Sequence, residues 1–398
     1  MRTERRAASA VAFRVPLAVI AAAVLDHAFV TREPGTRATD HLSSGLAPAL
    51  IALALAWVYP RLRPGAQAAA GIACGALALT AALAQLPELV LTSLAAGIAG
   101  VWLVIEGGRT LWRNRRPGRH VGSRVLGAGL AVIAAYLVLL PVAFAILATQ
   151  RGRTTPATAG LGQRVTLTTA DGLRLAGSYI PGRNRAAVIV FPGRDQPVRH
   201  ARLLARHGYG VLLIDRRGEG ASEGDINLYG WHGEADLHAA VAYLRRRPDV
   251  DPDRIGGLGL SVGGELMLQA AAHDARLRAV VSEGAGVRSF AEHRHMPGVG
   301  GVQQWLSPWL VQTAALTVLG DGGPPPDLVR LIGRIAPRPV LLISAAHGNS
   351  DEVLNRVYAA NAKASLWVVD RGDHVGALAA EPAEYERRVV GFLDAALR

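Results

Sequence analysis

The sequence predicts an α/β domain, with a mostly parallel sheet covered by helices on both faces, preceded by an all-α transmembrane region. Uncharged apolar runs of up to 25 residues fill the chain before residue 150. Later apolar runs are short and alternate with amphipathic windows of helical period, as in a βα-alternating domain. Half of the 398 residues are hydrophobic and the mean hydropathy is +0.23, which excludes a disordered chain.

Five apolar stretches precede residue 150, and we expect membrane helices at about 15–30, 43–59, 66–86, 89–105 and 125–149. At 1.5 Å per residue, the third and fifth are long enough to cross a hydrocarbon core of about 30 Å. The second and fourth are near the short limit, and Pro87 and Glu88 separate the fourth from its neighbour as a tight helical hairpin requires. Arg14 and Asp26 bracket the first, whose alternative interpretation is a signal-peptide apolar region.

The distribution of arginine predicts the orientation of these helices. Residues 1–150 hold 14 Arg against 6 Asp and Glu, a net charge of +8, whereas residues 151–398 hold 29 basic against 25 acidic residues, a net charge of +4. The loop 106–124 carries six arginines and lies on the same predicted side as Arg61 and Arg63, so both loops should be cytoplasmic. We therefore expect a multi-pass protein of the cell membrane whose C-terminal domain is extracytoplasmic; a cytoplasmic domain is the alternative.

Two features of the composition exclude other classes of protein. The basic excess lies between apolar runs rather than on a folded domain with stacking aromatics, which argues against nucleic-acid binding. The single cysteine, Cys74, lies inside an apolar run, so the chain has neither a disulfide framework nor a thiolate metal cluster.

The domain at 151–398 begins with a predicted β-hairpin, because residues 164–181 alternate around an Asp171-Gly172 turn. Six runs of Val, Ile and Leu that follow are typical of buried parallel strands. These strands are expected at 187–191, 210–215, 255–260, 279–282, 340–344 and 366–369, with helical windows at 231–247, 262–272 and 383–397.

Candidate catalytic residues follow the strands. Gly259-Leu260-Ser261-Val262-Gly263 lies between a strand and a helix, the context of a nucleophile elbow that presents Ser261; an ordinary glycine-rich turn is the alternative. His374, after the last strand, is the candidate general base, because it alone combines a strand-end position with the chain order Ser, acid, His. His347 is a competitor more readily explained as a solvated loop histidine.

The acid and the oxyanion donors are less sharply indicated. Asp351 lies on the loop where an acid is expected, although its surroundings also read as a helix N-terminus. Glu352 and Glu283, the latter at the end of the preceding strand, are the alternatives. Backbone N–H groups of Val262 and Arg194 are the expected oxyanion donors, because they follow the nucleophile and the first parallel strand.

These motifs resemble the α/β-hydrolase superfamily. The resemblance covers residues 160–398 and is carried by Phe191-Pro192-Gly193, by 215–222 (Asp-Arg-Arg-Gly-Glu-Gly-Ala-Ser), by Gly-Leu-Ser-Val-Gly and by Gly372-Asp373-His374. It is strongest for bacterial esterase, lysophospholipase and dienelactone-hydrolase-like enzymes, and it implies a Ser-acid-His triad and acyl transfer to water. Two departures are Pro192-Gly193 in place of His-Gly, and an acid loop without Gly-x-x-Asp spacing.

We therefore expect a membrane-anchored serine hydrolase that cleaves carboxylic or lipid-like esters, with no cofactor and no metal. Its partners would be a small acyl ester and membrane lipid. The alternatives are a membrane sensor or transport-associated protein with a ligand-binding hydrolase-like domain, and a serine peptidase. The βα alternation lapses at 284–337, so this segment is the expected lid. Within it, Val302, Trp305, Leu306, Trp309 and Leu310 have the spacing of an amphipathic helix. Either its apolar face is simply buried on the domain, or Trp305 and Trp309 line an acyl pocket or touch the membrane interface.

Overall fold

The computed structural model describes residues 2–86, 91–114, 121–153, 161–194 and 197–397. The chain forms two compact units. The first comprises Met1–Gly152 together with Trp305–Gly323, and the second comprises Arg153–Gln304 together with Pro324–Arg398. The first boundary is close to the predicted one. The expected lid, however, is divided between the units, because its middle packs with the N-terminal helices.

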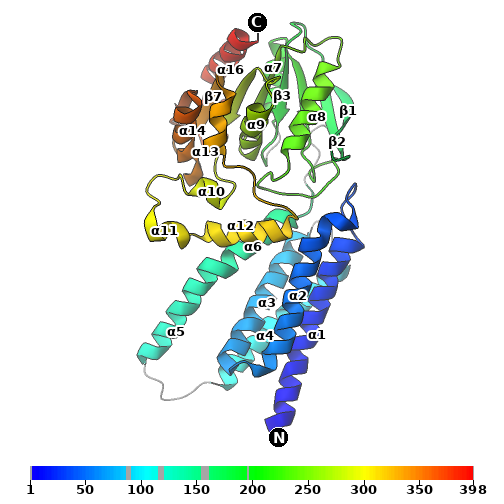
Figure 1. Cartoon of the computed structure of the whole chain (residues 1–398), viewed down its shortest axis with the longest axis vertical. Coiled ribbons are helices and arrows are strands. Elements are labelled where there is room, and N and C mark those ends of the chain that lie inside the picture. Colours follow the sequence, from blue (N-terminus) through cyan, green and yellow to red (C-terminus); the bar gives the residue numbers. More distant parts are fainter. Residues whose placement is uncertain (1, 87–90, 115–120, 154–160, 195–196, 398) are drawn as a thin grey trace. The chain divides into compact units, whose positions relative to one another are not determined.

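The second unit contains an eight-stranded sheet in the order β1-β2-β4-β3-β5-β6-β7-β8 (Figure 1). β1 and β2 form the predicted antiparallel hairpin, and β2 also pairs antiparallel with β4. All other neighbouring strands pair in parallel, so the predicted α/β fold is confirmed. The strands are β1 (Gln163–Thr168), β2 (Arg174–Ile180), β3 (Ala187–Phe191), β4 (Gly210–Ile214), β5 (Ile255–Leu260), β6 (Ala279–Glu283), β7 (Val340–Ala345) and β8 (Ser365–Val369).

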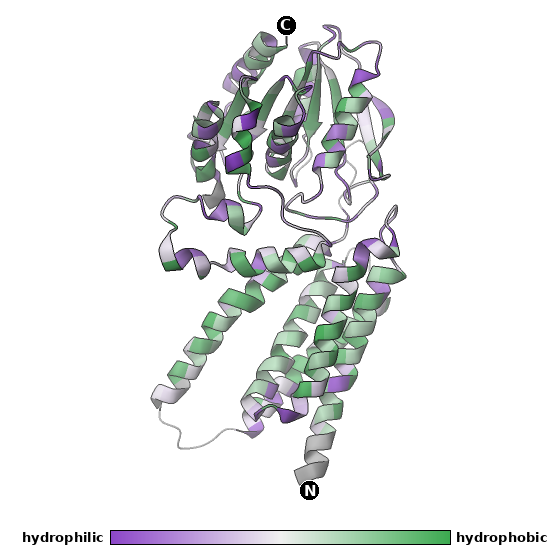
Figure 2. Ribbon diagram, viewed as in Figure 1, coloured by the Kyte–Doolittle hydropathy of each residue, from purple (hydrophilic) through white to green (hydrophobic). Residues whose placement is uncertain are grey.

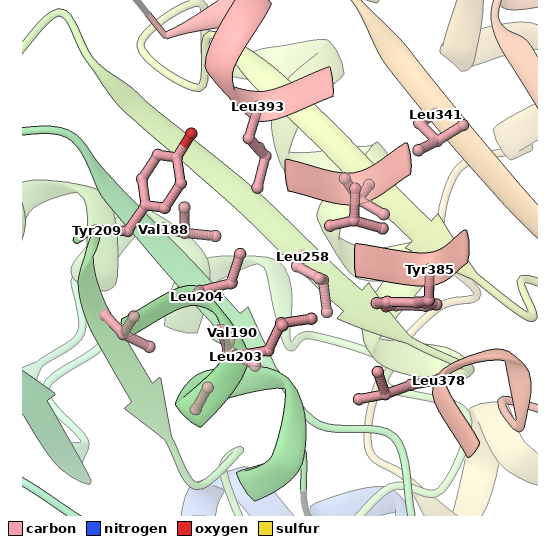
Figure 3. Close-up of a cluster of buried hydrophobic side chains, with 14 of the residues drawn as sticks. Val188, Val190, Leu203, Leu204, Tyr209, Leu258, Leu341, Leu378, Tyr385 and Leu393 are labelled. Atoms are coloured by element: carbon pink, nitrogen blue, oxygen red, sulfur yellow. The ribbon is translucent and has the colours of Figure 1, made fainter. Parts of the chain in front are cut away.

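Helices cover both faces of this sheet. Side chains of α7 and α16 pack with alternate strand residues in one core cluster, shown in Figure 3, where Leu204, Leu258 and Leu393 are fully buried. α9 packs on the opposite face, where Met267 lies against Gly257 of β5. The helices of this unit are α7 (Val198–Arg206), α8 (Glu234–Arg245), α9 (Val262–His273), α10 (Phe290–His293), α13 (Leu328–Leu331), α14 (Leu354–Ala362), α15 (Ala377–Ala380) and α16 (Pro382–Ala396); α11 (Gly301–Trp305) ends at the boundary of the units.

Among the described residues, the first unit contains five helical segments that are long and apolar enough to cross a membrane. Figure 2 shows hydrophobic residues along these helices. The segments are Ala8–Phe29, Ala38–Arg61, Pro64–Ala84, Leu91–Arg113 and Val125–Thr149. The helices are α1 (Arg2–Phe29), α2 (Leu42–Val58), α3 (Pro64–Ala84), α4 (Leu91–Arg113), α5 (Val121–Ala134) and α6 (Leu140–Thr149), with α12 (Pro308–Leu319) from the later segment.

Small residues bring the helices of this unit together. A Cβ on Gly75 of α3 would lie 2.5 Å from the carbonyl oxygen of Gly100 on α4, so the two backbones touch. The first apolar stretch forms part of α1, which packs on α2 and α4 and stacks Phe13 on Tyr59 at 3.8 Å between ring centroids. The predicted hairpin residues Pro87 and Glu88 lie outside the described residues, as do 115–120 of the arginine-rich loop.

Candidate active site

Ser261 lies at a sharp turn between β5 and α9. Its backbone has φ 52° and ψ −128°, a conformation that L-residues rarely adopt. Glycine on either side makes the turn sterically possible: a Cβ on Gly259 would lie 2.3 Å from the carbonyl oxygen of Gly263, and a Cβ on Gly263 would lie 2.5 Å from that of Pro192. The geometry is therefore that of a nucleophile elbow, in which the strain presents the serine hydroxyl.

His374 lies on the loop after β8, and its Nε2 is 2.9 Å from Oγ of Ser261. The segment after β6 brings the backbone close to the imidazole: a Cβ on Gly284 would lie 3.0 Å from Cε1 of His374. Gly284 has φ +71°, so a larger residue would be disfavoured here both by conformation and by space. The structure thus brings together the two residues that the sequence predicts as nucleophile and base.

Glu352 is the carboxylate that faces the histidine. Its Oε1 is 2.6 Å from Nδ1 of His374, while its Oε2 accepts a hydrogen bond from the Ala345 N–H at 2.7 Å. The Glu352 side chain is only 3% exposed. The preferred prediction, Asp351, is therefore corrected in favour of its alternative, because the carboxylate on Nδ1 belongs to Glu352. Both residues lie in the turn Ser350–Val353, and the side chain of Asp351 lies outside the described residues.

Glu283 does not bond to the histidine, contrary to the second alternative for the acid. Its Oε1 accepts a hydrogen bond from the N–H of Ala377 at 2.9 Å, and its main-chain oxygen accepts one from the N–H of Ser261 at 2.7 Å. It therefore holds the backbone of the nucleophile and of the histidine loop. Glu283 is buried, with Oε2 3.8 Å from Nε2 of His200. Burial, and next the charge of Glu283, raise the pKa of Tyr385 well above its ordinary range.

The loop after β3 lies directly beside the nucleophile. A Cβ on Gly193 would lie 2.9 Å from Cβ of Ser261, which explains why glycine is needed at this position. Arg194 follows with an exposed side chain, and Asp195 lies outside the described residues. Val262 is the first residue of α9, where backbone N–H groups lack partners within the helix. The N–H groups of Arg194 and Val262 remain the predicted oxyanion donors.

The other predicted residues lie elsewhere. Trp305 and Trp309 belong to the first unit, at the end of α11 and the beginning of α12. His347 is exposed on the loop after β7. No cluster of three or more His, Cys, Asp or Glu side chains among the described residues could hold a metal ion.

Comparison with known proteins identifies relatives that match part of this chain. The sequence model of the X-Pro dipeptidyl-peptidase (S15) family matches residues 149–331. Uncharacterized protein Rv2307c of Mycobacterium tuberculosis is 34% identical over 225 residues, which cover 53% of this chain and 71% of that protein. Thiohydrolase aneE of Aspergillus aculeatus is 29% identical over 190 residues, or 46% of this chain; the match spans 58% of that protein's length.

Two solved structures are similar to part of the chain. The α/β hydrolase GrgF from Penicillium sp. has a TM-score of 0.49 and 22% identity, and the match covers 59% of this chain and 98% of that chain. The Pyrococcus furiosus esterase Pf2001 has a TM-score of 0.49 and 23% identity, with 62% and 99% coverage.

Proposed function

Because the chain belongs to the α/β-hydrolase superfamily, we propose that its second unit is a serine hydrolase that cleaves carboxylic esters through an acyl-enzyme. One observation carries the proposal: Glu352, His374 and Ser261 form a continuous relay, with contacts of 2.6 Å and 2.9 Å at the two imidazole nitrogens. This arrangement serves nucleophilic catalysis, because a serine hydroxyl needs an adjacent base, and the base needs a carboxylate to orient it.

In the proposed mechanism, Oγ of Ser261 attacks the ester carbonyl while Nε2 of His374 takes the hydroxyl proton. Glu352 keeps the remaining proton on Nδ1 and stabilises the imidazolium. The N–H groups of Val262 and Arg194 would bind the oxyanion of the tetrahedral intermediate. Its collapse breaks the ester bond, and His374 returns the proton to the leaving alcohol. A water molecule, deprotonated by His374, then attacks the acyl-enzyme; the bond to Oγ of Ser261 breaks, His374 returns the proton to Oγ, and the acid is released.

Peptide cleavage is a second candidate, favoured by the family match to X-Pro dipeptidyl-peptidases over residues 149–331. A third acyl bond, a thioester, is suggested by the similarity to a fungal thiohydrolase. All three reactions can use the same relay, and they differ in the leaving group that accepts the proton. A comparison of matched ester, thioester and X-Pro amide substrates therefore separates them. We propose the ester, preferably with a medium or long acyl chain.

We further propose that the five apolar helices anchor the enzyme in the cell membrane. Large hydrophobic side chains such as Leu53, Ile98 and Ile133 are more than half exposed on these helices, as expected of surfaces that face lipid. The arginines of the loops 59–63 and 106–124 favour a cytoplasmic position for both loops. Five crossings would then place the hydrolase unit on the extracytoplasmic side.

The decisive test uses the full chain in detergent or nanodiscs, a fluorophosphonate probe and p-nitrophenyl esters of graded chain length. Ser261→Ala should abolish labelling and lower ester turnover by about 10³-fold or more, since Ser261 is the attacking atom. The exposed Ser365→Ala, at the start of β8, is the matched control and should label normally. Persistent labelling of a folded Ser261→Ala variant would refute the assignment, and an unlabelled, inactive wild type would favour a ligand-binding domain.

If the substrate is a lipid-like ester, kcat/KM should depend on the length of the acyl chain. Burial of each additional CH₂ contributes about 0.8 kcal/mol, so kcat/KM should rise about fourfold per methylene until the acyl site is full. A flat profile from acetyl to decanoyl esters would leave a small-ester hydrolase.

A further inference from the structure

The segment Trp305–Leu319, which includes α12, is attached to the ends of predicted membrane helices. Oδ1 of Asp321 accepts hydrogen bonds from the N–H groups of Ser43 and Ser44, at 2.8 and 3.0 Å. These N–H groups belong to the first turn of α2, so a carboxylate 278 residues away supplies the cap that this helix end lacks locally. The attachment therefore lies where α2 begins.

α12 also packs alongside α6, the last part of the fifth apolar segment (Figure 1). Gln312 and Leu316 are the buried residues of α12, and α12 contacts both α6 and α2. Both contacts are within the first unit. The ends of membrane-spanning helices lie at the boundary between hydrocarbon and water, so the bonds of Asp321 to the first turn of α2 place the C-terminal end of the segment near that depth.

The length and composition of the segment exclude a position across the membrane and a position in water. At 1.5 Å per residue, the 12 residues of α12 extend about 18 Å, too short to cross a hydrocarbon core of about 30 Å. Residues 305–320 carry no charged side chain, whereas a helix with a water-facing side normally carries several. Trp305, Leu306 and Leu310 are nevertheless 61%, 57% and 37% exposed.

We propose that the segment Trp305–Leu319, which contains α12, is an interfacial segment that lies in the headgroup region of the bilayer, with Trp305, Leu306 and Leu310 in contact with lipid. Tryptophan favours this region because its ring is apolar and its N–H is polar. The exposed apolar side chains then contact lipid, and the depth follows from the attachment of Asp321 to the beginning of α2. The proposal therefore gives Trp305 a role at the membrane interface rather than in an acyl pocket. The inference rests on the proposal that the first unit spans a membrane.

Labelled single-cysteine variants of the full chain in phosphatidylcholine nanodiscs can test this position. Cys74→Ala removes the single native cysteine. Leu306→Cys then reports on the interfacial segment, Leu53→Cys on a lipid-facing site within α2, and Ala383→Cys on an exposed site of the hydrolase unit. Each variant carries a fluorescent thiol label whose quenching is measured with aqueous iodide and with lipids brominated near the headgroup or deep in the chain.

At position 306 we expect strong quenching by the shallow brominated lipid, weak quenching by the deep one and partial quenching by iodide. A label at Leu310→Cys should behave in the same way. If position 306 behaves like position 383, with quenching by iodide alone, or is protected from all quenchers, the inference is overturned while the membrane proposal stands. If position 53 is also untouched by lipid quenchers, the membrane proposal itself fails.

Discussion

Replacement of Glu352 by glutamine tests the relay most directly, because the structure predicts which way the amide will turn. In the native chain, Oε1 of Glu352 faces Nδ1 of His374, and Oε2 accepts a hydrogen bond from the N–H of Ala345. Glutamine has only one acceptor oxygen for these two positions. If the oxygen keeps the backbone bond, the NH₂ group faces Nδ1 and selects the imidazole tautomer that cannot take the proton of Ser261.

The opposite orientation of the amide carries its own cost. It places the NH₂ group against the N–H of Ala345, so two donors meet in a buried place where neither can reach water; Glu352 is 3% exposed. An unsatisfied buried donor costs about 1–3 kcal/mol. The structure therefore favours the inactive tautomer of His374.

The size of the effect follows from the charge that is lost. A carboxylate 2.6 Å from Nδ1 stabilises the imidazolium by about 6 kcal/mol at an effective dielectric constant of about 20. At about 1.4 kcal/mol per factor of ten, its removal corresponds to about 10⁴ in kcat. A similar loss, also about 10⁴, accompanies the equivalent acid-to-amide change in a serine protease triad.

The measurement is the kcat of full-length Glu352→Gln on a p-nitrophenyl ester, with Asp351→Asn as the matched control one residue away. Thermal unfolding of both variants checks that the fold is retained. In Glu352→Gln we expect kcat to fall by about 10³–10⁴-fold. In Asp351→Asn we expect little change in kcat. An active Glu352→Gln variant together with an inactive Asp351→Asn variant would refute the reasoning.

Three further predictions concern positioning, pH and topology. Glu283→Ala removes the acceptor that holds the histidine loop and should lower kcat about 10- to 100-fold at constant KM. Glu283→Gln keeps an acceptor oxygen and should retain most of the native kcat. Equal losses of kcat in the two variants would refute a positioning role. Hydrogen bonds to Asp274 and Glu234 raise the pKa of His238 to about 9, so this ring's contribution to stability is complete below pH 6.5 and is lost as the pH rises through 9. Because the ring is 36% exposed, solvent screens its ion pairs, and we expect the free energy of unfolding to fall by about 1 kcal/mol, or Tm by 2–4 °C, over this rise in pH. His238→Gln should not show this fall, and an equal fall in that variant would contradict the prediction. Trypsin added to cells with a permeabilised outer layer should degrade the hydrolase unit and spare the loop 59–63, and the reverse pattern would overturn the proposed topology.

Much of the fold and the two reactive residues could be predicted from sequence because their signals are local. Alternating β-branched runs and amphipathic windows reflect burial on a strand or a helix, and the predicted parallel strands agree with β3 to β8. Ser261 was recognisable because its turn requires glycines on both sides at fixed spacing, and these glycines meet neighbouring backbone in the structure. His374 was recognisable by its place after the last strand.

The acid depended on tertiary structure. Asp351 and Glu352 are adjacent in the turn Ser350–Val353, and adjacent side chains on a helical turn point about 100° or more apart. The packing of this turn on β7, where Oε2 of Glu352 accepts the Ala345 N–H, therefore decides which of the two side chains meets His374. Residue type does not encode that direction. Glu283 lies at a strand end like the acid, yet its carboxylate turns to the N–H of Ala377.

The segment Trp305–Leu319 shows the same division between local and tertiary information. The apolar spacing from Val302 to Leu310 predicts one amphipathic helix, whereas the structure ends α11 at Trp305 and begins α12 at Pro308. The spacing does not show which elements the segment packs on. Its position in the sequence, between two strands of the sheet, predicts packing on the hydrolase domain. Only the folded chain places α12 on α2 and α6 and brings Asp321 to Ser43, because contacts between residues 278 apart arise from the packing of whole elements.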